Sequence, residues 1–284
     1  MPFSPAIADL LTALFGPEGA QERAQSIHFR DAGHGYDPFG MHPSFVALGE
    51  MVSAPLYDRY FRCLSYGHEN IPASGPAIIA ANHSGNIPVD GLLIWLDIVR
   101  NTTPTRVARP IADHFVPSLP YIGTLFSRGG MVGGSRGNAR SLLDAGELLM
   151  IFPEGVPGIV KPFSERYQLQ HFREGHAELA IRHSAPIVPV GVVGGEEQMP
   201  ALFTSKRLGK LFGLPVLPVP AVPVPLPVRY HLHYGPPIPV HEDYTPDQAD
   251  DPEVVKAVAA QVRRQRARGR QRQRAVQVRA LLAI

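Results

Sequence analysis

The sequence predicts an α/β fold in which a mostly parallel central sheet is flanked by helices, with N-terminal amphipathic helices and a basic C-terminal helix. Between residues 75 and 234, short apolar runs alternate with segments of helical spacing, a pattern typical of parallel strands connected by helices. A chain of 284 residues with 44% apolar residues is also long enough to bury both faces of such a sheet. We therefore expect one domain with appendages.

The expected elements follow in chain order. Residues 4–15 predict a short helix, and a Gly- and His-rich connector then reaches residue 42. Apolar residues recur at helical spacing from Phe45 to Leu64, and Pro55 is expected to kink this helix. The strands expected next cover residues 76–81, 105–108, 131–132, 147–152, 186–193 and 228–234. The remaining helices are expected over residues 91–100, 118–127, 138–145, 174–183 and 251–284.

Charge is distributed unevenly along the chain. Residues 253–284 carry nine Lys/Arg and one acidic residue, a local +8, which leaves −6 for residues 1–252 from the total of +2. We expect an N-terminal helical region over 1–69, an α/β domain over 70–245 and a basic helical tail over 246–284. An anionic partner is expected to meet the tail first.

Cysteine and proline content narrow the class of protein. Cys63 is the only cysteine, so no internal disulfide can form and a reducing compartment is expected. The N-terminal residues lack the positive region of a signal peptide, which also favours a cytoplasmic protein. The apolar run from Leu211 to Val228 contains six prolines, which rule out a regular membrane-spanning helix and predict an extended segment.

A candidate general base follows the first apolar run of the predicted sheet. His83 stands just after Ala77–Ala81, and Asp90 is the next ionisable residue along the chain. A neutral imidazole can take the proton of a hydroxyl group, and a carboxylate on its other nitrogen fixes the tautomer. Asp90 can equally cap a helix that begins at Gly91, and one carboxylate has enough lone pairs for both roles.

Two further polar sites are accompanied by glycines. Arg136 lies in a glycine-rich stretch before a helix, where backbone amides favour an anion and an arginine can grip a phosphate with two hydrogen bonds. Glu154 and Gly155 follow the apolar strand at 147–152, where a carboxylate can accept hydrogen bonds from substrate hydroxyls. Taken singly, each site is also compatible with an ordinary turn.

Together these sites resemble the glycerolipid acyltransferases, of which lysophosphatidic-acid acyltransferase is the type member. That family carries a His–Asp motif, a Gly…Arg motif, a Phe-Pro-Glu-Gly motif and a proline-centred strand, in this order. The segments that resemble these four motifs are residues 82–90, 130–136, 152–155 and 186–190. The third matches letter for letter, and residues 172–175 resemble the stretch that precedes the fourth. The resemblance covers roughly residues 70–240.

The spacing of the first motif departs from the commonest family pattern. Six residues separate His83 from Asp90, where the family commonly has four. This longer loop resembles divergent branches of the family that lean toward neutral lipids, so the spacing leaves the identity of the acceptor open.

The resemblance implies an O-acyltransferase and makes residues 70–245 the acyltransferase domain. His83 would deprotonate an acceptor hydroxyl that attacks a fatty acyl thioester on coenzyme A or acyl carrier protein, and Asp90 would orient the imidazole. Arg136 would hold the phosphate of a lysophospholipid or related glycerolipid, and Glu154 and Gly155 would line the glycerol pocket. No cofactor and no metal are implied, since acyl-CoA or acyl-ACP is a substrate.

Lipid substrates imply a membrane surface as a partner. We expect a cytoplasmic protein that is peripherally associated with the inner face of a membrane. The expected contacts are the helix at 45–64 within the N-terminal region, the proline-rich run and the basic tail. The tail lacks the interleaved aromatic residues that stack on bases, so no nucleic-acid partner is expected.

Two alternatives stay open. Residues 133–137 match the G-x-S-x-G elbow of α/β-hydrolases, and a serine esterase would use Ser135 with an acid such as Asp144 and a later histidine, His171 or His231. An acyltransferase fold can also serve as a non-catalytic lipid-binding module on a membrane surface. The other histidines show no metal-ligand spacing, so no metal site is expected.

Overall fold

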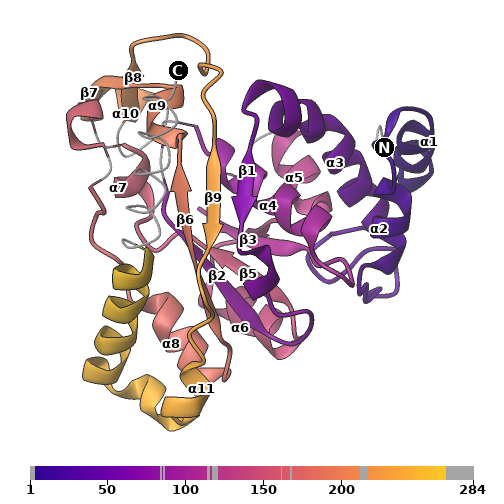
Figure 1. Cartoon of the computed structure of the whole chain (residues 1–284). Helices are drawn as coiled ribbons and strands as arrows, with labels where there is room; N and C mark the ends of the chain where they lie inside the picture. Colours follow the sequence, from indigo (N-terminus) through magenta and orange to yellow (C-terminus); the bar gives the residue numbers. More distant parts are fainter. Residues whose placement is uncertain are drawn as a thin grey trace.

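The computed structural model describes residues 4–83, 85, 87–113, 116, 121–160, 162–166, 168–211 and 217–266. Its main sheet has seven strands in the order β1-β9-β6-β2-β5-β3-β4 (Figure 1). These strands are β1 (Leu64–Tyr66), β2 (Ala77–Ala81), β3 (Ala108–Ala112), β4 (Val132–Gly133), β5 (Leu148–Ile151), β6 (Ile187–Val193) and β9 (His231–Tyr234). Neighbouring strands are parallel except β6 and β9. The predicted mostly parallel sheet is confirmed.

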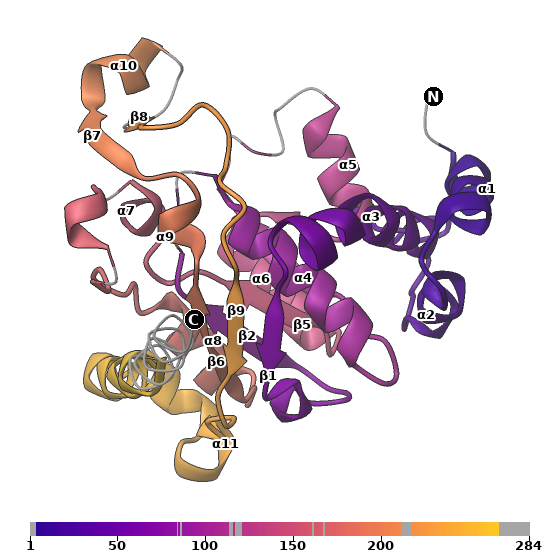
Figure 2. The ribbon, with the colours of Figure 1, turned by 45° about the horizontal axis from the view of Figure 1, so that its top comes forward.

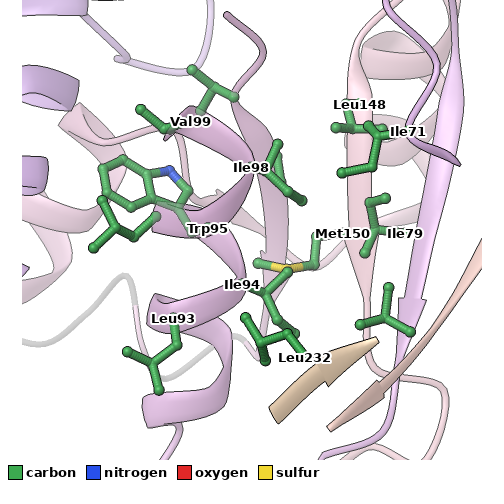
Figure 3. Packing of buried hydrophobic residues seen from close by; sticks show 14 of the residues in the cluster. Ile71, Ile79, Leu93, Ile94, Trp95, Ile98, Val99, Leu148, Met150 and Leu232 are labelled. Atoms are coloured by element: carbon green, nitrogen blue, oxygen red, sulfur yellow. The ribbon is translucent and has the colours of Figure 1, made fainter. Parts of the chain in front are cut away.

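Strand β2 shows why the sheet is buried on both sides. All five of its residues are fully buried, and successive side chains of a strand point to opposite faces. Ile79 packs on one face with α4 (Val89–Asn101), and Figure 3 shows Ile94 and Trp95 of that helix opposite Ile79. Ile78 packs on the other face with α6 (Arg136–Asp144) and α8 (Gly175–Arg182).

The N-terminal helices gather on the α4 side of the molecule. They are α1 (Pro5–Phe15), α2 (Ala20–Ser26) and α3 (Pro43–Pro55), with α5 (Ile122–Arg128) beside α3 (Figures 1 and 2). The short helix expected at 4–15 is present. Its N-cap is Ser4, whose hydroxyl accepts a hydrogen bond from the amide of Ile7 (3.3 Å), and Pro5 occupies the first turn.

The helix expected over 45–64 ends earlier than its apolar stripe does. α3 stops at Pro55, and Leu56–Tyr60 form a wider π-helical turn. A proline removes one backbone donor and crowds the preceding turn, which explains the change of helix type. Leu64 then begins β1 and pairs with His231 of β9, so the expected helix is wrong over residues 61–64. Strand β1 belongs to the main sheet, which places the boundary expected at residue 69 inside the domain.

Residues 217–228 of the proline-rich run are described, and the first four of them are extended as predicted. Residues Leu217–Pro220 form β8, which pairs antiparallel with β7 (Ala201–Ser205); residues 212–216 lie outside the described part. Figure 2 shows this pair beside α10 (Lys206–Leu211), away from the main sheet. The other short helices are α7 (Val156–Ile159), α9 (Gly195–Gln198) and α11 (Val240–Asp243).

The expected basic tail is, in its described half, an integral part of the domain. Residues 252–266 are helical, and their apolar side chains are buried in the cluster formed by α6 and α8. The helix expected from residue 251 is therefore present as far as residue 266, and its buried apolar stripe packs on the core. Residues 267–284, with the remaining arginines, lie outside the described residues. Of the helices in the described ranges, none combines the length and apolar composition that a bilayer span requires.

Candidate active site

The predicted base and its acid lie side by side. His83 follows β2 and Asp90 lies in the first turn of α4, and His83 Nδ1 is 2.9 Å from Asp90 Oδ2. Asp90 is fully buried, whereas 8% of His83 is exposed. A carboxylate at Nδ1 keeps the proton on that nitrogen and leaves Nε2 as the atom that can accept a proton. The second oxygen, Oδ1, accepts a hydrogen bond from the amide of Gly91 (2.8 Å). The helix begins at Val89 with Pro88 as its N-cap, so the expectation that Asp90 caps a helix starting at Gly91 is wrong.

His83 is held from two further directions. The side chain of the preceding residue, Asn82, donates to the carbonyl of Val192 in β6 (3.1 Å) and accepts from the amide of Val192 (2.7 Å). The imidazole itself stacks on Phe152, with ring centroids 4.2 Å apart and planes inclined by 24°. These contacts anchor the candidate base to the sheet and leave the imidazole little freedom to turn.

Strand register explains why motifs seventy residues apart meet. Ala80 of β2 pairs with Ile151 of β5, so the segments that follow the two strands, with His83 and Glu154, leave the same edge of the sheet next to each other. Gly158 of α7 closes over both positions. A Cβ atom added to Gly158 would lie 2.9 Å from the carbonyl oxygen of His83 and 3.0 Å from Cβ of Glu154. Only a glycine fits there without displacing the base or the Phe-Pro-Glu-Gly turn.

Glu154 faces into the protein. It is 1% exposed, and its Oε2 accepts a hydrogen bond from the amide of Gln170 (2.8 Å). Its Oε1 lies 3.3 Å from Nη2 of Arg266, at the end of the C-terminal helix. Gly155, in contrast, lines the cavity described next, with a left-handed backbone (φ +58°). The contact predicted between Glu154 and an acceptor hydroxyl stays a prediction, since both carboxylate oxygens are bonded within the protein.

A cavity of about 1090 Å³ opens beside His83. Its lining includes residues packed on both faces of the sheet, so the cavity extends across the carboxyl edge of the strands. We call one side the apolar wall, formed by Leu11, Leu48, Val52, Trp95 and Phe126 from α1, α3, α4 and α5. We call the other side the polar wall, formed by Ser135, Arg136, Arg173, His176 and Glu178 from α6, α8 and the residues before α8.

The polar wall carries two exposed arginines. Arg136, predicted from the sequence, is the first residue of α6. Arg173 was not predicted. Its Cζ lies 3.6 Å from the position of a Cβ on Gly155, and its backbone amide donates to the carbonyl of Pro153 (2.9 Å). Guanidinium groups at a cavity mouth favour a phosphate or carboxylate, which they bind through paired hydrogen bonds.

His176 is the buried titratable group of the polar wall. Its Nδ1 lies 2.9 Å from the carbonyl oxygen of Arg173, and Nε2 has no hydrogen-bond partner among the described residues. Burial lowers the pKa of His176 to about 4, so the ring is neutral near pH 7. A neutral ring donates from Nδ1 to the carbonyl of Arg173 and thereby holds the backbone of that arginine.

The residues of the esterase alternative do not come together. Ser135 is the N-cap of α6, where its hydroxyl accepts a hydrogen bond from the amide of Asn138 (3.0 Å). Its backbone is extended (φ −133°, ψ 153°), unlike the strained turn of a nucleophile elbow. Asp144 pairs with His183 (2.9 Å), and in the described ranges no hydrogen bond joins Ser135 to His171 or His231. No cluster of three or more His, Cys, Asp or Glu suited to a metal ion occurs among the described residues.

The sequence analysis gave no role to four residues of this site, and three of them carried a signal. Phe152 opens the Phe-Pro-Glu-Gly motif, Gly158 lies three residues after it, and Arg173 lies in the stretch 172–175 that resembles the family. Arg266 carried none, since nothing in a basic helix indicates which arginine turns inward.

Comparisons with known proteins identify a family model and relatives that match the chain. The Acyltransferase family model matches residues 62–193. An uncharacterised protein of Mycobacterium tuberculosis is 38% identical over 237 residues, which are 80% of this chain and 66% of that protein. A DGAT1/2-independent enzyme synthesizing storage lipids from Gallus gallus is 32% identical over 185 residues, 64% of this chain and 54% of that protein. The chain thus spans about half to two thirds of the length of these relatives.

A solved structure shows the same fold. The 1-acyl-sn-glycerophosphate (LPA) acyltransferase PlsC from Thermotoga maritima superposes with a TM-score of 0.50 over 92% of this chain and 97% of that chain, at 16% identity. The family model and this shared fold together show that the chain contains an acyltransferase domain over residues 62–193.

Proposed function

We propose that this protein transfers a fatty acyl group from a thioester, acyl-CoA or acyl-ACP, to a hydroxyl group of a lysophospholipid or related glycerolipid. The observation that carries the proposal is the His83–Asp90 pair, held at 2.9 Å beside a cavity large enough for lipid chains. The hydroxyl oxygen of the acceptor is itself the nucleophile once Nε2 of His83 takes its proton. The reaction therefore needs no nucleophilic side chain from the protein.

The reaction follows from the geometry of the pair. Nε2 of His83 takes the hydroxyl proton while the acceptor oxygen forms a bond to the thioester carbon, and Asp90 stabilises the resulting imidazolium. The tetrahedral intermediate then collapses, the carbon–sulfur bond breaks, and the thiolate leaves with the proton returned from His83. A thiolate is a good leaving group because the pKa of its thiol is about 8.5, so strong acid assistance is not required.

The two walls of the cavity suit the two parts of a lipid substrate. Each methylene of an acyl chain buried against the apolar wall contributes roughly 0.8 kcal/mol. Arg136 and Arg173 on the polar wall suit an anionic group. A neutral acceptor such as a diacylglycerol is the second candidate, since the avian relative is named for the synthesis of storage lipids and the His–Asp loop is long.

The experiment that tests the proposal is a panel of acceptors with release of free thiol as the readout. With a lysophospholipid or a diacylglycerol as acceptor, the wild type is expected to release thiol and form the acylated lipid. His83→Ala is expected to lower kcat by about 10³-fold or more, whereas Ser135→Ala keeps most of the activity. An inactive Ser135→Ala with an active His83→Ala would instead establish the esterase. Liposome binding without thiol release for every acceptor would favour the lipid-binding module.

We also propose that the protein is peripherally associated with the cytoplasmic face of a membrane. Large apolar side chains of α1 and α3 are exposed near the cavity, among them Leu10 (58%), Leu14 (64%), Phe15 (69%) and Val52 (63%). Their burial in the headgroup region would supply binding energy, and arginines would add about 1 kcal/mol each near anionic lipids.

Vesicle flotation separates the two contributions. Leu14→Glu with Phe15→Glu is expected to weaken binding to neutral and anionic vesicles alike. Removal of residues 267–284, which leaves the buried helix at 252–266 intact, is expected to weaken binding only to anionic vesicles at low salt. Equal binding by the truncated chain would remove the tail from the membrane contact.

A further inference from the structure

The Phe-Pro-Glu-Gly turn is tied to the C-terminal helix by a fully buried ion pair. Glu154 and Arg266 are 112 residues apart in sequence, and both side chains are completely shielded from solvent. Nη2 of Arg266 lies 3.3 Å from Oε1 of Glu154, and its Cζ lies 4.4 Å from the centroid of the Phe172 ring. The pair therefore joins the turn after β5, the residues before α8 and the helix at 252–266.

Further contacts around the ion pair hold the same three segments together. Glu154 also accepts a hydrogen bond from the backbone amide of Gln170. Arg263, on the same helix as Arg266, donates a hydrogen bond to the carbonyl of Leu169 (3.4 Å). The helix at 252–266 is itself fixed by buried apolar residues, which pack against α6 and α8. Arg266 thus projects from a rigid element onto the turn that carries Glu154.

The orientation of the turn depends on this contact. A carboxylate buried without a cationic partner is strongly unfavourable, so Glu154 would turn toward water if Arg266 lost its charge. Gly155 lines the cavity and Gly158 contacts both Glu154 and His83, so that rotation would disturb the cavity and the base together. Phe152, stacked on the imidazole, is the first residue of the same turn.

We propose that Arg266 is a positioning residue for acyl transfer, which acts through Glu154 to hold the Phe152–Gly155 turn against His83. The assignment of a catalytic consequence rests on the proposed function. The physical coupling between Arg266 and His83 does not, and it can be measured on its own.

The test compares three single variants. Arg266→Gln removes the charge, Arg266→Lys keeps it, and Arg264→Gln changes an exposed arginine two residues away on the same helix. Arg266→Gln is expected to lower kcat by about 10–100-fold while KM for both substrates changes by less than about threefold, because a small misplacement of the base affects chemistry more than binding. Arg266→Lys is expected to recover most of the loss, and Arg264→Gln to match the wild type.

A second readout is independent of activity. In protein labelled with ¹⁵N-histidine, the imidazole signal of His83, assigned by its absence in His83→Gln, is expected to shift in Arg266→Gln and to stay in place in Arg264→Gln. This measurement tests the coupling even if no acceptor is turned over. Thermal unfolding of each variant separates a change in fold from a change in position.

The outcomes are distinct. A shifted His83 signal in a folded Arg266→Gln that turns over no less than the wild type would overturn the catalytic role. An unchanged signal with unchanged kcat would overturn the proposal altogether. If Arg266→Gln does not fold, Arg266→Lys decides between the two roles. Both roles predict restored stability in this variant. A merely structural role predicts wild-type kcat, whereas a positioning role predicts a residual loss in kcat and a small shift of the His83 signal.

Discussion

The two walls of the cavity differ in chemistry and in support. The apolar wall is assembled from the N-terminal helices and α4, and its side chains are held by contacts with other apolar groups. The polar wall is built on the opposite face of the sheet, where Glu178 pairs with Arg140 and Arg182 and His176 holds the backbone at Arg173. His83 lies where the walls meet. The difference teaches that the two ends of an elongated molecule in this cavity would meet different surfaces, one apolar and one bearing arginines.

Substitution of the polar-wall arginines is expected to have the largest effect and tests whether the two walls bind different parts of the substrate. Arg136→Ala and Arg173→Ala are each expected to raise KM for an anionic acceptor by about 10–100-fold, because a hydrogen bond to a charged group contributes about 1.5–3 kcal/mol. KM for a diacylglycerol should stay unchanged, as should every constant in Arg59→Ala, an exposed arginine outside the cavity lining. An effect confined to the thioester donor would show that the polar wall binds the donor instead.

Because His176 of the polar wall is buried in its neutral form, the free energy of unfolding is expected to depend on pH. Its pKa is about 4 in the folded chain and about 6.5 when unfolded, so between these values the unfolded state binds more protons. The free energy of unfolding should therefore fall as pH falls from about 6.5 to 4, by at most about 1.4 kcal/mol per unit from this residue. Denaturant unfolding at several pH values should show a shallower slope in His176→Gln. His241→Gln, which changes an exposed histidine, should retain the wild-type slope.

Gly49 provides the smallest and most local test of the apolar wall. A Cβ at Gly49 would lie 2.9 Å from Cη2 of Trp95, so Gly49→Ala requires the indole to shift within the cavity lining. We expect a loss of about two- to fivefold in kcat/KM with the longest acyl donors and no loss with short ones, in line with overpacking costs. Gly137→Ala, which meets only the Ser135 hydroxyl at 3.9 Å, is the matched control. Equal losses for all chain lengths would contradict an acyl role for this wall.

Much of the sheet could be predicted because its strands are buried on both faces. Residues 77–81, 148–151 and 187–193 read as continuous apolar runs, and the structure has strands at each. The site could be anticipated for a related reason, since polar residues that directly follow parallel strands gather at one edge. This is how His83 and Glu154 come to neighbouring positions.

What could not be predicted depends on contacts between distant residues. Leu64 continues the apolar stripe of a helix, and only its pairing with His231 makes it a strand residue. Strand β3 is shifted to 108–112 from the expected 105–108 for a similar reason, because its pairing begins with β5 at Ala108 and ends with β4 at Ala112. The direction of Glu154 follows from Arg266, and no local pattern around either residue specifies that choice.

Asn82 gives the molecule one further property. The carboxamide of Asn82 makes hydrogen bonds with both the carbonyl and the amide of Val192, as the backbone of a neighbouring strand would. A side chain thus continues the hydrogen bonding between β2 and β6 beyond the end of β2. His83, the next residue, is consequently held at the end of a fully buried central strand. Under the proposed function, substitutions in either wall would change which lipids are accepted without moving His83.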